Sequence, residues 1–280
     1  MESLISYFET MPSSHRSFLL VGGLTLFWVI ESAAPLFHFQ YKKWKHAATN
    51  VFFTLTTAVV NLPLAFILVM ASDWAVDHQI GVLQWIEMPM WAQLIVGLLI
   101  LDLVGAWLIH FTEHKVKFMW QFHLIHHIDQ EIDTTSGNRH HPGESVFRFV
   151  FTTLAVVVAG APMWMVLLYQ TLSVIFTQFN HSNWKFPQSL DKALSYILVT
   201  PGMHRVHHHH RQPYSDMNYG NLFSVWDRLF GTYIEVDNEK LQYGVDTYPD
   251  AAAAGNIWEL LKVPFVGYRK PIEYQEEEKL

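Results

Sequence analysis

Residues 90–114 read MWAQLIVGLLILDLVGAWLIHFTEH and join a long apolar run to two histidines. The apolar part has about the length of 20 residues that an α-helix needs to cross the hydrocarbon core of a bilayer. His110 and His114 stand four positions apart, so their imidazoles lie on one face if the helix continues. The stretch predicts a membrane-spanning helix over residues 90–111 that ends in a candidate metal-binding pair.

The composition of the whole chain is that of a membrane protein. Of its 280 residues, 51% are hydrophobic and only 15% are charged. Apolar stretches at residues 18–34 and 47–71 are also long enough to span a bilayer. A further apolar zone, residues 146–179, is divided by the turn signal Gly160-Ala161-Pro162, and its short arms predict a shallow helical hairpin. We expect an all-α fold, an integral membrane helical bundle.

The flanking charges predict the orientation of this bundle. Lys42, Lys43 and Lys45 crowd the loop after the first span, whereas the next loop is acidic. Short loops rich in lysine and arginine stay in the cytoplasm, so the third span returns to that side at His110. The hairpin brings its end, near His181, back to the same side. We expect a cytoplasmic helical cap that carries all the histidine clusters.

Nine histidines between His110 and His208 repeat a helical spacing. After the first pair come the clusters His123-x2-His126-His127 and His204-x2-His207-His208, with His181 alone between them. Residues three and four apart share a helix face, so each cluster is expected to point its imidazoles in one direction. Neutral imidazole suits iron, copper, nickel and zinc, and one ion seldom takes more than a few histidine ligands. The number of histidines therefore indicates a dinuclear metal centre.

Several classes of protein are excluded by what the sequence lacks. It contains no cysteine, which rules out disulfides, thiolate-bound haem and protein-bound iron–sulfur clusters. A net charge of −7 argues against nucleic acid as a partner. There is no glycine-rich phosphate loop and no serine nucleophile elbow. Because spans and histidine segments alternate without a linker, we expect residues 1–280 to form a single membrane-embedded domain.

The histidine clusters resemble the histidine boxes of the fatty acid hydroxylase/sterol desaturase superfamily, in the form found in its bacterial members. The resemblance is strong over residues 90–235, and we expect a histidine-box catalytic region at residues 110–235. Three more motifs fit the same superfamily. They are Asn218-Tyr219-Gly220 followed by WDRLFGTY at residues 226–233, Arg139-x-His141-Pro142, and Asn180-His181-Ser182-Asn183.

This resemblance implies a non-haem di-iron membrane oxygenase. Such an enzyme uses O2 and two electrons to hydroxylate or desaturate a fatty acyl, sterol or ether lipid taken from the bilayer. It holds two iron ions, for which zinc can substitute. Because no flavin, haem or iron–sulfur motif is visible, the electrons have to come from an external reductase or small electron carrier. The resemblance assigns as metal ligands His110, His114, His123, His126, His127, His181, His204, His207 and His208.

Three further residues are candidates for the reaction site. Asp102 lies two turns before His110 within the third span, where an ionisable side chain is costly and usually has a purpose. It can orient a ligating imidazole or form a hydrogen bond between helices. His141 is a candidate for a ligand or for a residue on the substrate side. Asn218 is a candidate acceptor for the second ring N–H of a ligand.

The main alternative is a histidine-rich transition-metal transporter or a metal-binding membrane protein. Transport sites lie near the bilayer midplane between broken helices. Here the histidines gather at and beyond the predicted ends of the spans, which favours the oxygenase. Within the oxygenases, the sequence leaves hydroxylation and desaturation as alternatives.

Overall fold

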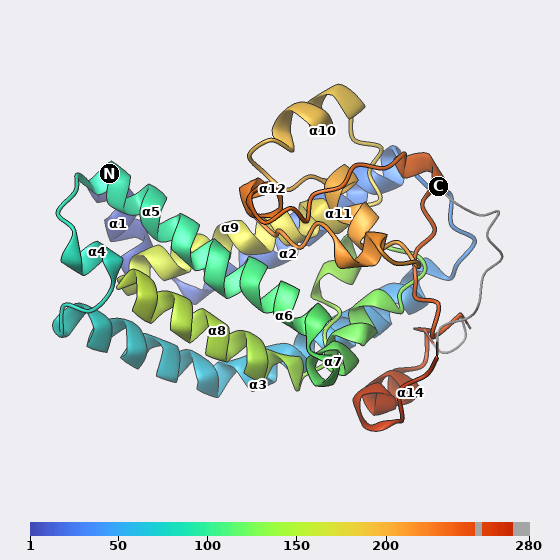
Figure 1. Cartoon of the computed structure of the whole chain (residues 1–280), viewed down its shortest axis with the longest axis horizontal. Coiled ribbons are helices and arrows are strands. Elements are labelled where there is room, and N and C mark those ends of the chain that lie inside the picture. Colours follow the sequence, from blue (N-terminus) through green and yellow to red (C-terminus); the bar gives the residue numbers. More distant parts are fainter. Residues whose placement is uncertain (250–253, 271–280) are drawn as a thin grey trace.

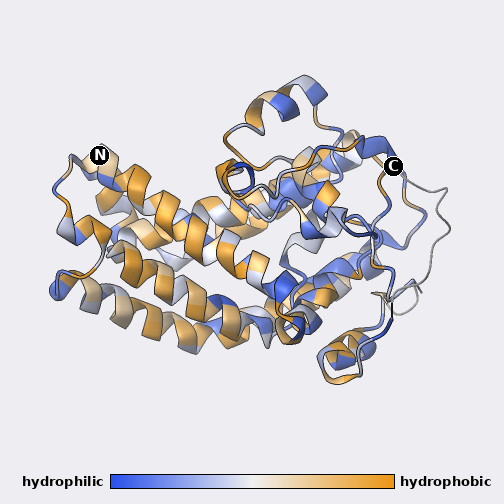
Figure 2. Ribbon diagram, viewed as in Figure 1, coloured by the Kyte–Doolittle hydropathy of each residue, from blue (hydrophilic) through white to orange (hydrophobic). Residues whose placement is uncertain are grey.

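The computed structural model describes residues 1–249 and 254–270. Long helices form a bundle, and short helices and loops form a cap at one end of it (Figure 1). The bundle is mostly hydrophobic, whereas hydrophilic residues are concentrated in the cap (Figure 2). In the described residues no strand forms, and the extended segments make only isolated bridges such as Pro35 with Trp184. The predicted all-α class is confirmed.

Three helices have the length and apolar composition of membrane spans, at Ser13–Ala33, Lys43–Trp85 and Met90–Lys115. Large apolar side chains on their outer faces are exposed, and Phe18 and Phe66 are each 74% exposed. Such exposure is unfavourable in water but suits contact with lipid chains. This half of the bundle comprises α1 (Glu2–Glu9), α2 (Ser13–Ala33), α3 (Lys43–Asp77), α4 (Val82–Trp85), α5 (Met90–Asp102), η1 (Leu103–Leu108) and α6 (Ile109–Lys115).

The helix α3 is longer than the apolar stretch from which its span is predicted, since it extends past residues 47–71 at both ends. Its first turns lie beside the cap, where the His46 ring nitrogens are 2.9 Å from Asp129 and 3.1 Å from Asp133. Apolar composition marks only the part of a helix that lies in lipid. Contacts with the cap therefore account for the additional polar turn at the start of α3.

A π-helical segment, η1, connects α5 to α6 within one continuous helical rod. A π turn contains one extra residue and changes the direction in which the following side chains point. It lies directly before His110, the first histidine of the centre. The simple helical period used to align Asp102 with His110 does not hold across this segment.

Helices α8 (Glu144–Ala159) and α9 (Met163–His181) form an antiparallel pair whose turn contains Gly160-Ala161-Pro162. Gly160 adopts a left-handed φ of 68°, and a Cβ atom there would lie 2.4 Å from the Ile80 carbonyl oxygen. The Ser72 hydroxyl donates to the Ala161 carbonyl at 2.8 Å, which ties this turn to the far end of α3. The hairpin thus runs from the cap to the opposite end of the bundle and back.

The cap packs on the bundle through a second apolar core in which Phe53 of α3 meets Ile125 and Leu260. The buried Arg139 side chain donates to the Ile125 carbonyl, the Asn50 side chain and the Ala254 carbonyl. The cap elements are α7 (Lys117–His127), η2 (Thr134–Asn138), α10 (Gln188–Leu194), α11 (Pro201–His207), η3 (Tyr214–Asp216), α12 (Val225–Leu229), η4 (Asn238–Lys240), α14 (Ile257–Lys262) and η5 (Val263–Phe265).

Candidate metal centre

Two groups of imidazoles meet where the bundle joins the cap. In each group, one ring nitrogen per residue lies within 4.8 Å of the corresponding atoms of the other members. They contain the nine histidines predicted from the sequence. The five-histidine group consists of His110, His114, His123, His127 and His207, and the four-histidine group consists of His126, His181, His204 and His208.

Each box of three histidines is divided between the two groups. On α7, His123 and His127 join the five-histidine group, and His126 joins the other. The last box is divided in the opposite sense, because only its His207 joins the five-histidine group. The expectation that a box points all its imidazoles in one direction is wrong, since adjacent helix positions differ by about 100°. Each box therefore contributes histidines to both groups and links them through its helix.

Contacts within the four-histidine group centre on His181. Its Nε2 atom lies 3.1 Å from Nε2 of His126, 3.0 Å from that of His204 and 3.2 Å from that of His208. Its Nδ1 atom faces the Thr177 carbonyl oxygen at 2.8 Å. A carbonyl only accepts, so Nδ1 carries the proton and Nε2 presents a lone pair. Ligand nitrogens around one metal ion are about 3 Å apart at usual bond lengths, which these separations match.

The five-histidine group shows the same geometry. His110 and His123 direct Nε2 atoms at each other at 3.1 Å, while their Nδ1 atoms face the Tyr219 carbonyl and the Glu144 carboxylate. Both Nε2 atoms therefore present lone pairs, which repel unless a cation lies between them. The buried Nε2 atom of His207 has no hydrogen-bond partner among the described residues. This donor set fits a transition-metal ion bound by neutral imidazoles.

Burial favours the neutral form that metals bind. Desolvation lowers the pKa of His123 to about 3, despite the opposing effect of the Glu144 carboxylate. Desolvation, reinforced by the neighbouring imidazoles, also holds the pKa of His126 and of His207 well below the ordinary value. At neutral pH these imidazoles are therefore uncharged, so each has a lone pair for a metal ion and none repels the ion.

Acceptors fix the outer nitrogen of five of the nine imidazoles, which sets the tautomer and the aim of each ring. His114 Nδ1 lies 3.2 Å from Asp216, and His207 Nδ1 lies 2.8 Å from the Met217 carbonyl. His110, His123 and His181 have the acceptors described above. The Nδ1 atoms without a partner in the described part of the chain belong to His126, His127, His204 and His208.

A buried network that the sequence did not reveal lies beside the centre. The Glu144 carboxylate accepts from His123 Nδ1 at 3.0 Å and from Arg148 Nε at 2.7 Å, and it lies 2.9 Å from His140 Nδ1. The His140 ring stacks on His126 with centroids 4.6 Å apart. Arg148 also donates to Glu113 at 2.7 Å. Glu144 and Arg148 stand four apart on α8, and this spacing is the sequence signal that could have found their part of the network.

We predict that Glu144→Gln weakens metal binding by about 10- to 100-fold, because the amide keeps the shape but loses the charge that orients His123. Competition with a chelator of known affinity measures the change. Glu259→Gln is the control, because it makes the same chemical change on α14 at a side chain that is 53% exposed. An affinity equal to that of the Glu259 control would contradict the role assigned to Glu144.

The structure places Asp102 in a hydrogen-bond network between elements. It accepts from the Tyr169 hydroxyl at 2.9 Å, from the Trp226 indole at 2.9 Å and from the backbone of Leu222 and Phe223. None of these described partners is an imidazole. The geometry therefore matches the bridging alternative weighed for this residue and not the orientation of a ligand.

His141 and Asn218 also lie outside both groups. His141 Nδ1 accepts from the Gly143 backbone at 2.9 Å, and its neighbour His140 is the residue beside the centre. Asn218 has a left-handed φ of 57° and bonds to the carbonyls of Met203 and Ile234. The carbonyls that face ligands belong to the residues on either side of it. Asn218 thus shapes the loop instead of accepting from an imidazole.

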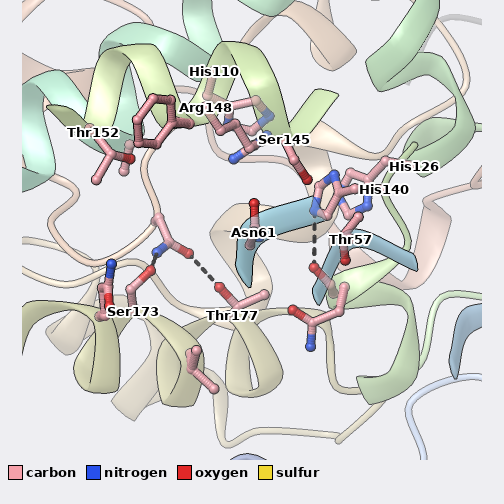
Figure 3. Close-up of a pocket in the computed structure, with 18 of the residues that line it drawn as sticks. Thr57, Asn61, His110, His126, His140, Ser145, Arg148, Thr152, Ser173 and Thr177 are labelled. Carbon is pink, nitrogen blue, oxygen red and sulfur yellow. Dashed lines mark hydrogen bonds between the residues drawn. The ribbon is translucent and has the colours of Figure 1, made fainter. Parts of the chain in front are cut away.

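A cavity of about 500 Å³ runs from the centre into the bundle. His110, His126, His140 and Arg148 line it beside side chains of α3 and α9 such as Asn61 (Figure 3). The imidazoles of both groups thus border a space within the bundle.

Comparisons with known proteins agree with this geometry. A family model described as fatty acid hydroxylase matches residues 94–232. Human alkylglycerol monooxygenase is 30% identical over 58% of this chain and 34% of its own length. Ornithine lipid hydroxylase OlsE of Rhizobium tropici is 27% identical over 54% of this chain and 43% of its own length. Methylsterol monooxygenase 2-2 of Arabidopsis thaliana is 24% identical over 62% of this chain and 64% of its own length.

The matched region spans less than half the length of the first two of these relatives. No solved structure matches the chain. The family match covers both three-histidine boxes, the histidine pair and the loop that follows the last box. By its sequence and the arrangement of its histidines, this chain belongs to the fatty acid hydroxylase superfamily.

Proposed function

We propose that this protein is a membrane oxygenase that hydroxylates or desaturates a lipid with O2 and electrons from an external donor. The observation that carries the proposal is the pair of buried histidine groups, whose lone pairs converge at about 3 Å beside a cavity within the bundle. The relatives named above are a monooxygenase of alkylglycerol, a hydroxylase of ornithine lipid and a monooxygenase of methylsterol. Their names support a lipid substrate here.

The nine histidines are the proposed ligands, five for one ion and four for the other. Two iron ions held there would supply the activation of O2, with two electrons taken from the external donor, that oxidation of an unactivated C–H bond requires. The protein side chains hold the ligand rings through Glu144, Asp216 and backbone carbonyls. Zinc is a proposed substitute during overexpression.

A transition-metal transporter is disfavoured by the position of the histidines. Both groups lie at one end of the bundle, beside the cap, whereas the Gly160 turn and the far end of α3 lie at the other. A transport path would need ligands near the middle of the bilayer. The lysine-flanked start of α3 lies at the histidine end, which supports a cytoplasmic location for the centre.

The test is metal content and product in the same preparation. Full-length protein purified in detergent from iron-supplemented cells is expected to carry about two metal ions per chain by elemental mass spectrometry. Supplied with O2, a reductant and an electron carrier, membranes containing the protein should accumulate lipids gaining one oxygen or losing two hydrogens. A folded chain with no metal after iron reconstitution would refute the proposal.

Removal of the metals is expected to destabilise the protein, because ions that bind only the folded state add to its stability. Chelation should lower the thermal unfolding midpoint in detergent, and returning iron should restore it. A midpoint that does not respond to chelator, in a sample shown to have lost its metal, would speak against an ion between the facing lone pairs.

A further inference from the structure

The cavity beside the metal centre is lined by polar rows from three helices. On α9, Gln170, Ser173 and Thr177 are spaced three and four apart and lead along one face to His181. The length of α9 between Gln170 and His181 is about 16 Å at the normal helical rise. Helix α8 contributes Ser145, Arg148 and Thr152, and α3 contributes Thr57 and Asn61. Figure 3 shows these rows facing one another across the cavity.

Part of this polar lining is already satisfied within the protein. Asn221 donates to the Ser173 hydroxyl at 2.7 Å and accepts from the Thr177 hydroxyl at 3.0 Å. The Thr57 hydroxyl donates to carbonyls of its own helix. These groups make the wall polar, but their hydrogen bonds need no ligand.

Two amides in the same lining are different. The side-chain amides of Asn61 and Gln170 make no hydrogen bond with any residue in the described part of the chain, and both residues are exposed. Asn61 lies near the middle of a predicted span, and Gln170 lies within the hairpin. An amide without a hydrogen-bond partner is strongly unfavourable in hydrocarbon. Two such side chains facing one cavity point to a ligand that supplies their partners.

The lining also limits the charge of that ligand. Among the described lining residues, Arg148 is the one lysine, arginine, aspartate or glutamate. Its guanidinium is paired with Glu113 and Glu144, each at 2.7 Å. No unpaired cation is therefore offered to a phosphate or carboxylate, which recognition of an anionic headgroup requires. A side-chain amide has an NH2 donor and a carbonyl acceptor, so it can bind an uncharged acceptor as well as an uncharged donor.

We propose that the cavity binds a lipid with an uncharged hydrogen-bonding group, such as a hydroxyl, ester or amide, and that Asn61 and Gln170 bind this group. The inference rests on the proposed function, because it names the substrate class of the same site. A plain hydrocarbon chain would leave both amides without partners. We place the entrance for a lipid from the bilayer between α3 and α9, where the lining residues Asn61, Ala65 and Gln170 are exposed.

The test compares the binding of three probes to metal-loaded, full-length protein in detergent. The probes are 1-monooleoylglycerol, which is uncharged and polar, 1-octadecene, which has no hydrogen-bonding group, and dioleoylphosphatidate, which is anionic. Titration followed by thermal stabilisation gives each affinity. We expect the monoacylglycerol to bind at least about tenfold more tightly than the other two, as loss of one or two buried hydrogen bonds implies. Equal binding of all three would overturn the inference.

Variants locate the effect. Asn61→Leu and Gln170→Leu should each weaken monoacylglycerol binding by about tenfold and leave octadecene binding unchanged. Asn61→Gln, which keeps the amide, should retain most of the affinity. Val59→Leu is the matched control on the same helix, because Val59 is 67% exposed and does not line the cavity. Equal affinities in Asn61→Leu and Val59→Leu would refute the role of Asn61.

Metal content measured in the same samples separates this inference from the proposed function. A protein with two ions that does not discriminate among the probes would refute the substrate class alone. A protein without metal that still prefers the monoacylglycerol would refute the oxygenase and leave the lipid site in place.

Discussion

His126→Ala and His207→Ala are each expected to end lipid oxidation and to lower the metal content from about two ions per chain to about one. The two substitutions act on different ions. His126 belongs to the four-histidine group and His207 to the five-histidine group. Because both ions are proposed to act together on O2, loss of either is expected to reduce product below detection. Each variant should remain inserted and folded, since its partner groups stay in place.

The measurement combines elemental analysis with lipid mass spectrometry on membranes from cells expressing each variant. His210→Ala is the matched control, because His210 lies in the same run of four histidines but belongs to neither group, and its ring faces the Gln242 carbonyl at 3.2 Å. The control should keep both ions and full activity. Wild-type levels of product in His126→Ala or His207→Ala would show that the facing nitrogens do not bind the reactive ions.

Double substitution gives a sharper result. If each group holds one ion independently, the combined variant should contain no metal, and its losses should equal the sum of the two single losses. If the divided boxes couple the groups, either single variant should lose both ions. The contact through which such coupling would act is that between His123 of one group and His126 of the other, whose ring centroids are 5.2 Å apart.

The histidines of the centre could be named from sequence because helical spacing is a local property. Positions three and four apart are neighbours on a helix in any tertiary structure, so the histidine boxes can be predicted without knowledge of the fold. The division of each box between two groups cannot be predicted in this way, since it depends on how α7 and α11 face each other. The position of His140 beside the centre cannot be predicted for a similar reason. It lies in a loop, and only the docking of that loop sets its ring on His126.

The same distinction explains Asp102. Its cost inside an apolar segment indicates a residue with a purpose, but the residues around it carry no information about its partners. Three of these partners, Leu222, Phe223 and Trp226, lie about 120 positions later, and Tyr169 lies on α9, so they come together with Asp102 only in the folded chain. Long-range hydrogen bonds of this kind have no periodic signal. Burial of an ionisable group can be predicted locally, whereas its role cannot.

Asp227→Asn is expected to disrupt the five-histidine group from outside it. The Asp227 carboxylate accepts from the Trp107 indole, the Thr232 hydroxyl and the backbone N–H groups of Tyr219 and Gly220, at 2.7 to 2.9 Å. It therefore fixes the loop whose Met217 carbonyl faces His207. All of these described partners are neutral donors.

The asparagine keeps the shape and removes the charge. One of the two carboxylate oxygens becomes an NH2 donor, which then faces a donor in the native geometry. At the Oδ2 position this donor is the Gly220 N–H, and at the Oδ1 position it is the set of donors from Trp107, Tyr219 and Thr232. Leaving buried donors unpaired costs about 1 to 3 kcal/mol each, so the thermal midpoint should fall. Asp237→Asn, at a 57% exposed side chain, should leave it unchanged.

The metal content distinguishes loosening of this loop from general destabilisation. Tyr219 and Met217 present their carbonyls to His110 and His207, which both belong to the five-histidine group. The four-histidine group draws its one backbone acceptor from Thr177, on α9. Asp227→Asn should therefore weaken the ion of the five-histidine group by about 10- to 100-fold and leave the other in place. Equal loss of both ions would mean that Asp227 supports the cap as a whole and does not orient these two ligands.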